Sequence, residues 1–112
     1  MSKFDEKVAF YLAEAKKLNL SIDEKLLSAV THGLGPSIYS QDSETISATD
    51  PAEVARVKTN FLVKKLGLSD GPELDKAIDE VMEQVGKSNR NKYRAIVYSL
   101  LVMKFKKQSV YA

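Results

Sequence analysis

The sequence predicts an all-α fold of about five helices, in which two helical hairpins pack around a buried C-terminal helix. Apolar residues recur every three or four positions through most of the chain, which is the period of a helix with one buried face. No stretch alternates apolar and polar residues in the way that a half-buried strand does. From Ala95 to Met103 only Ser99 is polar, and a helix that is apolar on every side needs neighbours on all its flanks.

The chain has the length and composition of one soluble domain, which we expect to span residues 1–112. Of its 112 residues, 44% are hydrophobic and 29% are charged, as in globular rather than disordered proteins. The absence of cysteine excludes disulfides, thiolate metal sites and cysteine nucleophiles. Asp5 and Glu6 stand where a signal peptide would be apolar, and no apolar run reaches the ~20 residues of a membrane-spanning helix. We therefore expect a cytoplasmic protein without membrane association.

The first predicted hairpin joins a helix over residues 3–18 to a helix that ends near His32. Ser2 precedes the first helix with Asp5 three positions later, a pattern in which both side chains cap free backbone N–H groups. The second helix is expected to begin with a capping box at Ser21–Glu24 and to end at Gly33 in the left-handed conformation. His32, the only histidine, is interpreted as a cap of the last free carbonyls, because no second metal ligand accompanies it.

A long polar loop, from Leu34 to Asp50, is predicted between the second and third helices. It is rich in Ser, Thr, Asp and Glu, and it carries a small apolar anchor at Ile38 and Tyr39. We favour a surface loop held by side-chain to backbone hydrogen bonds, with Ile46 as a further anchor. Loops of this length are often functional, so an enzyme that uses residues 37–49 is retained as a remote alternative.

The third and fourth predicted helices have clear signals at both ends. Asp50 followed by Pro51 marks a helix start, and Gly67 ends that helix. The fourth helix follows the corner at Gly71–Pro72, and Gly86 closes it. We expect Ser88 or Asn89 to cap the last helix, which then runs to Lys107. The corner residues Lys17–Ser21 match Lys65–Ser69 closely, which suggests that the two hairpins are built alike.

Three carboxylates are expected along one edge of the fourth helix, at the positions Asp75, Asp79 and Glu83. Like charges at this spacing repel one another by a few tenths of a kcal/mol per pair, so something should offset them. The alternatives are pairing with basic residues of the same fold, a divalent cation, or a basic partner. We favour pairing within the fold, because cation sites usually draw ligands from a loop or from several elements.

The best candidate for an outside contact is a basic cluster at the start of the last helix: Lys87, Arg90, Lys92 and Arg94. After Glu83 the chain has seven basic residues and no acidic one. Free N–H groups at a helix start favour anions, and the cations add to that field. Nucleic-acid binding would use these residues with Lys104, Lys106 and Lys107, but it is not favoured, because the fourth helix is acidic and would repel phosphates.

Four stretches together resemble a family of small uncharacterised bacterial proteins, one of the families known as domains of unknown function. The stretches are Gly33–Tyr39, Asp42–Ser47, Asn60–Leu68 and Ser88–Arg94. The resemblance covers nearly the whole chain and implies a small, soluble, all-helical bacterial protein. It implies no activity, cofactor or site residue.

The sequence carries no recognisable enzyme signature. We find no phosphate-binding glycine pattern, no histidine pair and no nucleophile elbow, and we expect no catalytic residue, metal or cofactor. We therefore predict a non-enzymatic binding or scaffolding module. A homodimer is the first partner hypothesis, because a second copy of the chain could cover the apolar last helix. Anion or nucleic-acid binding through the basic cluster is the alternative.

Overall fold

The first helix, α1 (Lys3–Lys17), begins as its sequence predicts in the computed structural model, which describes residues 2–47, 49–86, 89 and 91–111. The Ser2 hydroxyl accepts a hydrogen bond from the Asp5 backbone N–H at 3.1 Å, and the Asp5 carboxylate accepts one from the Ser2 N–H at 3.4 Å. This reciprocal pair satisfies two backbone donors that have no partner within the helix. The capping box predicted for α1 is therefore confirmed.

The second helix, α2 (Glu24–Leu34), differs from prediction at both ends. Asp23 occupies the N-cap position without a side-chain cap bond, so the capping box predicted at Ser21–Glu24 is wrong. The helix also continues past Gly33, and Gly35 takes the left-handed φ of 65° instead. The longer helix brings Leu34 against the core, and this apolar contact stabilises the extension.

The connection after α2 is more ordered than the predicted polar loop. It contains a 3₁₀ turn, η1 (Gly35–Tyr39), and a single helical turn, α3 (Gln41–Glu44). The Ser37 hydroxyl donates to the Leu34 carbonyl at 3.0 Å, and the Ser43 hydroxyl donates to the Ser37 carbonyl at 2.9 Å. The predicted local side-chain to backbone hydrogen bonds are thus present, but they hold short helical turns rather than irregular loop.

The third predicted helix has two parts, α4 (Pro51–Arg56) and its π-helical continuation η2 (Val57–Lys65). The Asp50 side chain accepts from the Ala52 N–H at 3.0 Å, which confirms the predicted helix start. Wider i→i+5 hydrogen bonds, such as Leu66 N–H to Phe61 carbonyl at 2.9 Å, replace the α-helical pattern in η2. The wider helical turn matches the spacing of the buried apolar residues of this segment, which are four or five positions apart.

The two interhelical corners that match in sequence also match in backbone conformation. Asn19, after α1, has a φ of 60°, and Gly67, after η2, has a φ of 72°. They occupy the same place within the matching segments Lys17–Ser21 and Lys65–Ser69. Each corner ends its helix with a residue in the left-handed region, so the resemblance between the hairpins includes the way in which each helix stops.

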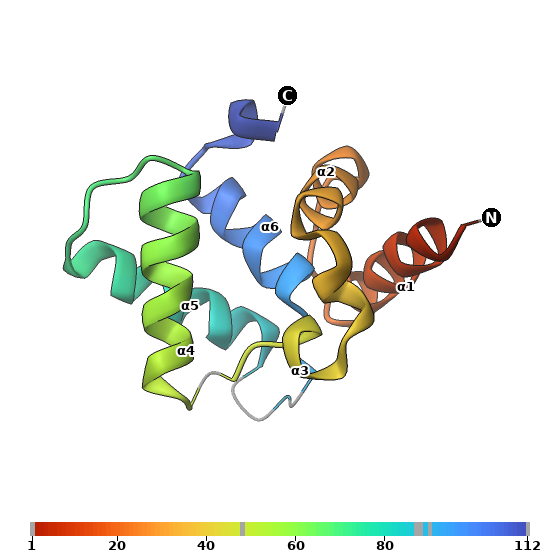
Figure 1. Cartoon of the computed structure of the whole chain (residues 1–112), viewed down its shortest axis with the longest axis horizontal. Helices are drawn as coiled ribbons and strands as arrows, with labels where there is room; N and C mark the ends of the chain where they lie inside the picture. Colours follow the sequence, from red (N-terminus) through yellow and green to blue (C-terminus); the bar gives the residue numbers. More distant parts are fainter. Residues whose placement is uncertain (1, 48, 87–88, 90, 112) are drawn as a thin grey trace.

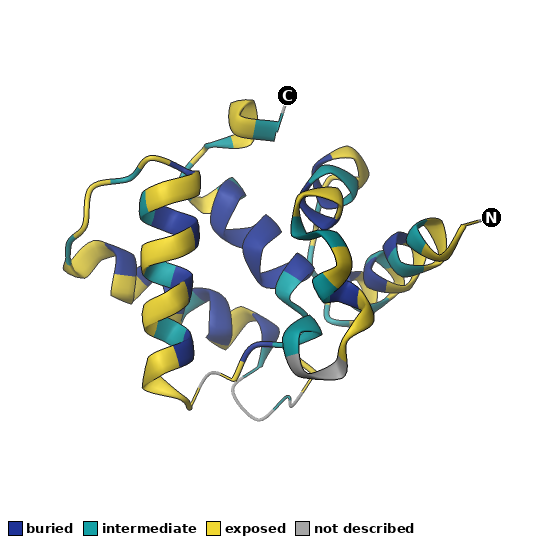
Figure 2. Ribbon diagram, viewed as in Figure 1, coloured by how far each residue is buried: buried dark blue, intermediate teal, exposed yellow. Residues whose placement is uncertain are grey.

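The last α-helix, α6 (Arg94–Lys104), is buried on every side by the rest of the chain. Eight consecutive residues, Ala95–Val102, are buried, including Ser99. Figure 1 places α6 between α2 on one side and α4 with α5 (Pro72–Val85) on the other, and Figure 2 shows its dark, buried surface in the middle of the molecule. The final turn, η3 (Gln108–Tyr111), contacts α2.

The predicted all-helical class is confirmed, with α1, α2, α4 plus η2, α5 and α6 as the five expected helices. The described residues contain no strand, only an isolated bridge between Thr45 and Tyr93. That bridge corrects the start of the last helix: α6 begins at Arg94 rather than near Ser88, because the backbone before it pairs with residues 45–46. None of the described helices has both the length and the apolar composition that crossing a bilayer requires.

Candidate functional site

The structure describes two of the four cations in the predicted anion site, Lys92 and Arg94. Lys87 and Arg90 lie outside the described residues. Lys92 is only 5% exposed, its Nζ donates to the Asn89 carbonyl, and burial lowers the pKa of its amine. The last helix begins at Arg94 rather than near Ser88, so Lys92 lies before the helix and only Arg94 lies in its first turn. Anion binding by the cluster stays a prediction.

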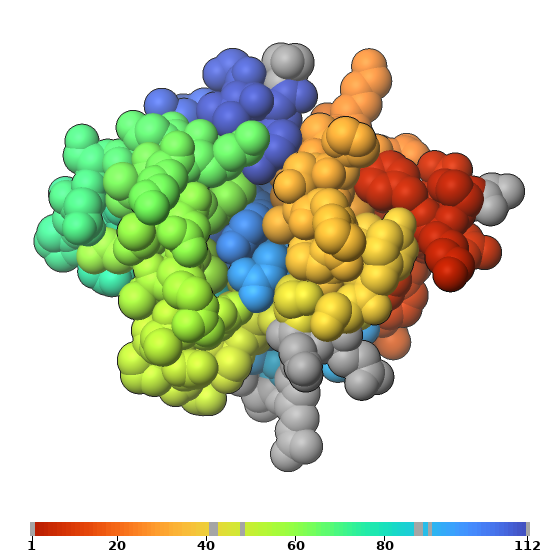
Figure 3. Space-filling view, viewed as in Figure 1, coloured from red at the N-terminus to blue at the C-terminus, as the bar shows by residue number. Residues whose placement is uncertain are grey.

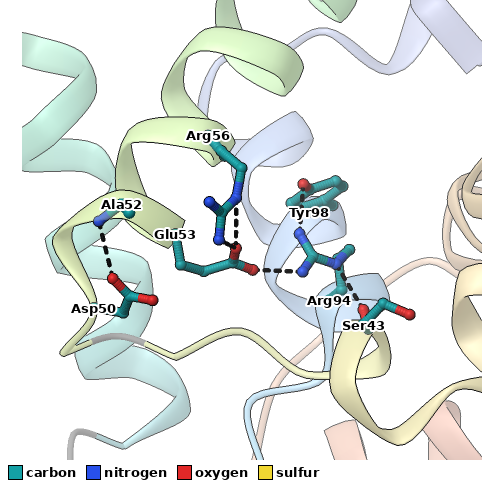
Figure 4. Close-up of polar contacts among 7 residues, drawn as sticks. All are labelled: Ser43, Asp50, Ala52, Glu53, Arg56, Arg94 and Tyr98. Carbon is teal, nitrogen blue, oxygen red and sulfur yellow. Dashed lines mark hydrogen bonds and ion pairs between the residues drawn. The ribbon is translucent and has the colours of Figure 1, made fainter.

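Arg94 extends into the interior and binds groups from three parts of the chain (Figure 4). Its Nε donates to the Ser43 carbonyl at 2.9 Å, and Nη1 donates to the Tyr98 hydroxyl at 3.0 Å. Its Nη2 lies 2.5 Å from Oε1 of Glu53, in an ion pair whose side chains are 15% and 11% exposed. Burial opposes the charge of Arg94, but Tyr98 and Glu53 outweigh it and raise the pKa of the guanidinium.

Glu53 accepts from a second arginine as well as from Arg94. Its Oε2 receives bonds from Nε and Nη2 of Arg56, at 3.1 and 2.8 Å. Burial favours the neutral form, yet the hydrogen bonds from the two arginines outweigh it and lower the pKa of the Glu53 carboxyl. The cluster therefore stays charged at neutral pH and joins α3, α4 and α6.

The Glu53–Arg94 cluster is a structural clamp that ties α3 and α4 to α6. Every buried side-chain nitrogen or oxygen among the described residues has a hydrogen-bond partner. The pairing of Glu53 with Arg94 was not predicted from the sequence. The two partners are 41 residues apart, and nothing in the local pattern links them.

A second polar cluster joins α1 to α3. Oε2 of Glu44 accepts from the Tyr11 hydroxyl at 2.5 Å and from Lys7 Nζ at 2.6 Å. Tyr11 is fully buried, and burial together with the neighbouring carboxylate raises the pKa of its phenol well above the ordinary value. This cluster positions the surface beside it by holding α1 against the connection that contains η1 and α3.

That surface carries an aromatic patch, which we define as Phe10 and Tyr39 with the charged residues Lys3, Glu6 and Lys7. Phe10 is 42% exposed and Tyr39 is 50% exposed, and the five residues line a shallow groove of about 410 Å³. In Figure 3 the α1 surface (red) adjoins the yellow surface of the η1–α3 connection on the right of the molecule. The patch offers exposed aromatic rings with charges of both signs at their side.

The patch was not predicted, although the sequence carries a signal for it. Phe10 lies outside the apolar stripe of α1, so a large aromatic side chain was already on the polar face. Tyr39 was expected to be an anchor with Ile38; Ile38 is indeed buried, whereas Tyr39 is exposed. The ring of Phe10 packs edge-on against Tyr93 at a centroid distance of 5.2 Å, so it has a fixed backing.

Of the three carboxylates predicted along one edge of α5, Asp75 pairs within the fold, as favoured. Lys58 Nζ lies 2.8 Å from Asp75 and 3.0 Å from Asp70, and these bonds raise the pKa of the lysine. Lys104 of α6 pairs with Glu80 at 3.0 Å. Asp75 thus finds its cation on η2 rather than on the last helix. No group of three potential metal ligands lies together in the described part of the chain.

His32 lies in the last turn of α2, as predicted, and a carbonyl-capping role for its imidazole stays a prediction. Its ring meets Phe4 of α1 edge to face, with centroids 5.9 Å apart and planes at 87°. The histidine therefore lies at the junction of the first two helices, beside a groove described below.

The protein is thus small and all-helical, with charged clusters at Glu53 and Glu44 that join its helices and with exposed aromatic rings at Phe10 and Tyr39. The model of a family described as "Protein of unknown function (DUF2853)" matches residues 10–109, and the chain therefore belongs to this family. The predicted membership of a family of unknown function is confirmed, while the bacterial origin stays a prediction. Comparison with curated proteins finds no relative of the chain.

Proposed function

We propose that the protein is a non-enzymatic binding module whose aromatic patch binds a second copy of the chain. The observation that carries the proposal is the exposure of two large aromatic side chains, Phe10 and Tyr39, on one groove with a charged rim. Protein interfaces are enriched in aromatic residues at their centre and polar at their edge.

The rigidity of the patch favours a binding role. Phe10 is backed by the rings of Tyr11 and Tyr93, with centroids 5.8 and 5.2 Å away, so little rotational freedom is lost on association. Lys7 is tied to Glu44 at 2.6 Å, which fixes part of the rim. A surface that is already ordered loses less entropy when it binds.

The charges of the patch suit a copy of itself. A twofold interface places the same patch on both protomers, so each charge must find its complement within the same set of residues. Lys3 and Lys7 provide positive charge, and Glu6 provides negative charge. The last helix, which motivated a homodimer in the sequence, contributes no surface to it, because its own chain covers it.

The exposed ring area predicts a weak dimer. From the exposed fractions of Phe10 and Tyr39, two protomers would bury roughly 370 Å² of ring surface. At about 25 cal/mol/Å², this area contributes about 9 kcal/mol. Association itself costs about 4–15 kcal/mol; at the low end, about 4–5 kcal/mol, the remainder of about 4–5 kcal/mol corresponds to a Kd on the order of 0.1–1 mM.

Sedimentation equilibrium or light scattering tests the proposal between about 10 µM and 2 mM, a range that brackets the expected Kd. We expect the average mass to rise from monomer toward dimer for the natural sequence. The double variant Phe10→Ser with Tyr39→Ser should remain monomeric. Val110→Ser, at the third large exposed apolar side chain among the described residues, is the matched control and should behave like the natural sequence. A monomer mass throughout, or unchanged association of the double variant, would refute the proposal.

A further inference from the structure

A second and larger groove lies on a different face of the α1–α2 hairpin. It has a volume of about 790 Å³ and runs along α2, where Lys25, Ser28, Ala29 and His32 line it. Phe4 of α1 and Tyr111 of η3 complete the apolar part of the lining. Four elements that are far apart in sequence thus contribute to it, since Lys65 at the end of η2 also belongs to the groove.

The aromatic walls of this groove are held in place. The Phe4 ring packs against His32 with a centroid distance of 5.9 Å. Tyr111 lies close to Gly33, where an added Cβ would stand 3.5 Å from its Cε1 atom, and Lys65 Nζ lies 5.2 Å from the Tyr111 ring centroid. Burial raises the pKa of Tyr111 to about 12, so at neutral pH its hydroxyl keeps its proton and can donate a hydrogen bond.

The charged rim favours a monovalent anion. Lys25 and Lys65 are both exposed, and neither has an ion-pair partner among the described residues. Glu24 is the one acidic residue in the lining. Two lysines against one glutamate leave an excess of one positive charge when His32 is neutral, which a single carboxylate balances and a phosphate dianion exceeds.

We propose that this groove binds a small amphiphilic carboxylic acid. The apolar part of the ligand would contact Phe4 and Tyr111, and its carboxylate would lie on the side of Lys25 and Lys65. The size of the groove suits such a ligand, since small-molecule sites are commonly 300–1,000 Å³ and combine apolar walls with a few polar groups. This inference does not depend on the dimer, which uses other residues.

The proposal is tested with octanoate as the probe and with 1-octanol and n-octylammonium as matched controls of the same chain length. Amide chemical shifts of the full chain are followed during titration, below the micelle concentration of octanoate and octylammonium and below the solubility limit of octanol. We expect octanoate to shift signals of Ser28, Ala29 and Tyr111 in a saturable way. Octanol and octylammonium should bind at least about fivefold more weakly than octanoate, because they lack the attraction to the lysines.

Two lysine variants separate a built site from general surface charge. Lys65→Met should weaken octanoate binding about fivefold, whereas Lys64→Met should leave it within about twofold, because Lys64 is exposed on the same helix but does not line the groove. The same spectra report whether each variant is folded. Equal binding of all three probes, equal effects of the two variants, or no localised shifts with octanoate would overturn the proposal.

Discussion

The two arginines that bind Glu53 differ in their burial and in their further hydrogen bonds, while the carboxylate that they share is the same. Arg94 and Arg56 both donate to this carboxylate, but their side chains are 15% and 59% exposed. We predict that Arg94→Met destabilises the protein much more than Arg56→Met. Methionine retains much of the length and apolar surface of arginine, so the comparison chiefly reports the loss of the charged group.

The expected magnitudes follow from what each substitution leaves behind. Removing one partner of a buried ion pair typically costs about 3–5 kcal/mol, because the other charge is left in the interior. Arg94→Met also removes the bonds to Ser43 and Tyr98, but Arg56 still pairs with Glu53. We therefore expect the lower end, about 3 kcal/mol. Arg56→Met should cost less than about 1 kcal/mol, as exposed pairs do.

Urea unfolding followed by far-UV circular dichroism measures both effects at neutral pH. A domain of this size is expected to have an unfolding free energy of about 5–15 kcal/mol, so even the larger loss leaves a measurable transition. The double variant Glu53→Gln with Arg94→Met should cost less than the sum of the single changes, because the two groups interact. Similar losses for the two arginine variants would show that burial does not govern the strength of these pairs.

Three further predictions concern the acid limit, the alkaline limit and one helix end. Because folding lowers the pKa of Glu53, its carboxylate contributes to stability above its ordinary pKa of 4.5, and this contribution disappears as the pH falls. Glu53→Gln should therefore flatten the acid side of the profile of unfolding free energy against pH. Because folding raises the pKa of Tyr11, the contribution of its hydroxyl to stability is present below pH 10.0 and is lost as the pH rises. Tyr11→Phe should therefore cost about 1–2 kcal/mol of unfolding free energy at neutral pH and reduce the loss of stability at alkaline pH. An unchanged alkaline stability profile would contradict this reasoning. Gly67→Ala should cost about 1–2 kcal/mol through backbone strain alone, since Gly67 has a positive φ and no atom lies within 4 Å of the added Cβ. Gly33→Ala, in α2, should instead be neutral or stabilising. Thermal unfolding of both variants checks the contrast.

Local chemistry predicted the helices because helix formation depends on short-range patterns. The capping pair at Ser2 and Asp5, the start at Asp50–Pro51 and the stops at Gly67 and Gly86 all occur as the sequence predicts. The errors have the same origin. Ser21–Glu24 carries a capping pattern that the second helix does not use, and Gly33 is passed because extending the helix brings Leu34 to the core.

The predicted and observed candidate sites differ because a concentration of charge is the strongest local signal for a site in the sequence. It selected Lys87, Arg90, Lys92 and Arg94, and of the two members that the structure describes, one is buried and the other forms the centre of the clamp. A run of basic residues does not reveal whether a distant carboxylate binds it. The same limit applies to Phe10. The sequence places it on the polar face of α1 but does not show that Tyr39 lines the same groove.

The sequence by itself determined the helical class, the buried last helix and most helix ends, because periodicity, caps and left-handed stops act over only a few residues. Only the tertiary structure decided which charges pair and which aromatic rings remain exposed. Glu53 meets Arg94 across 41 residues, and Phe4 meets Tyr111 at one groove from opposite ends of the chain. Such contacts depend on how the helices pack around α6, and hydrophobic packing specifies that arrangement through many weak contacts that no local motif records.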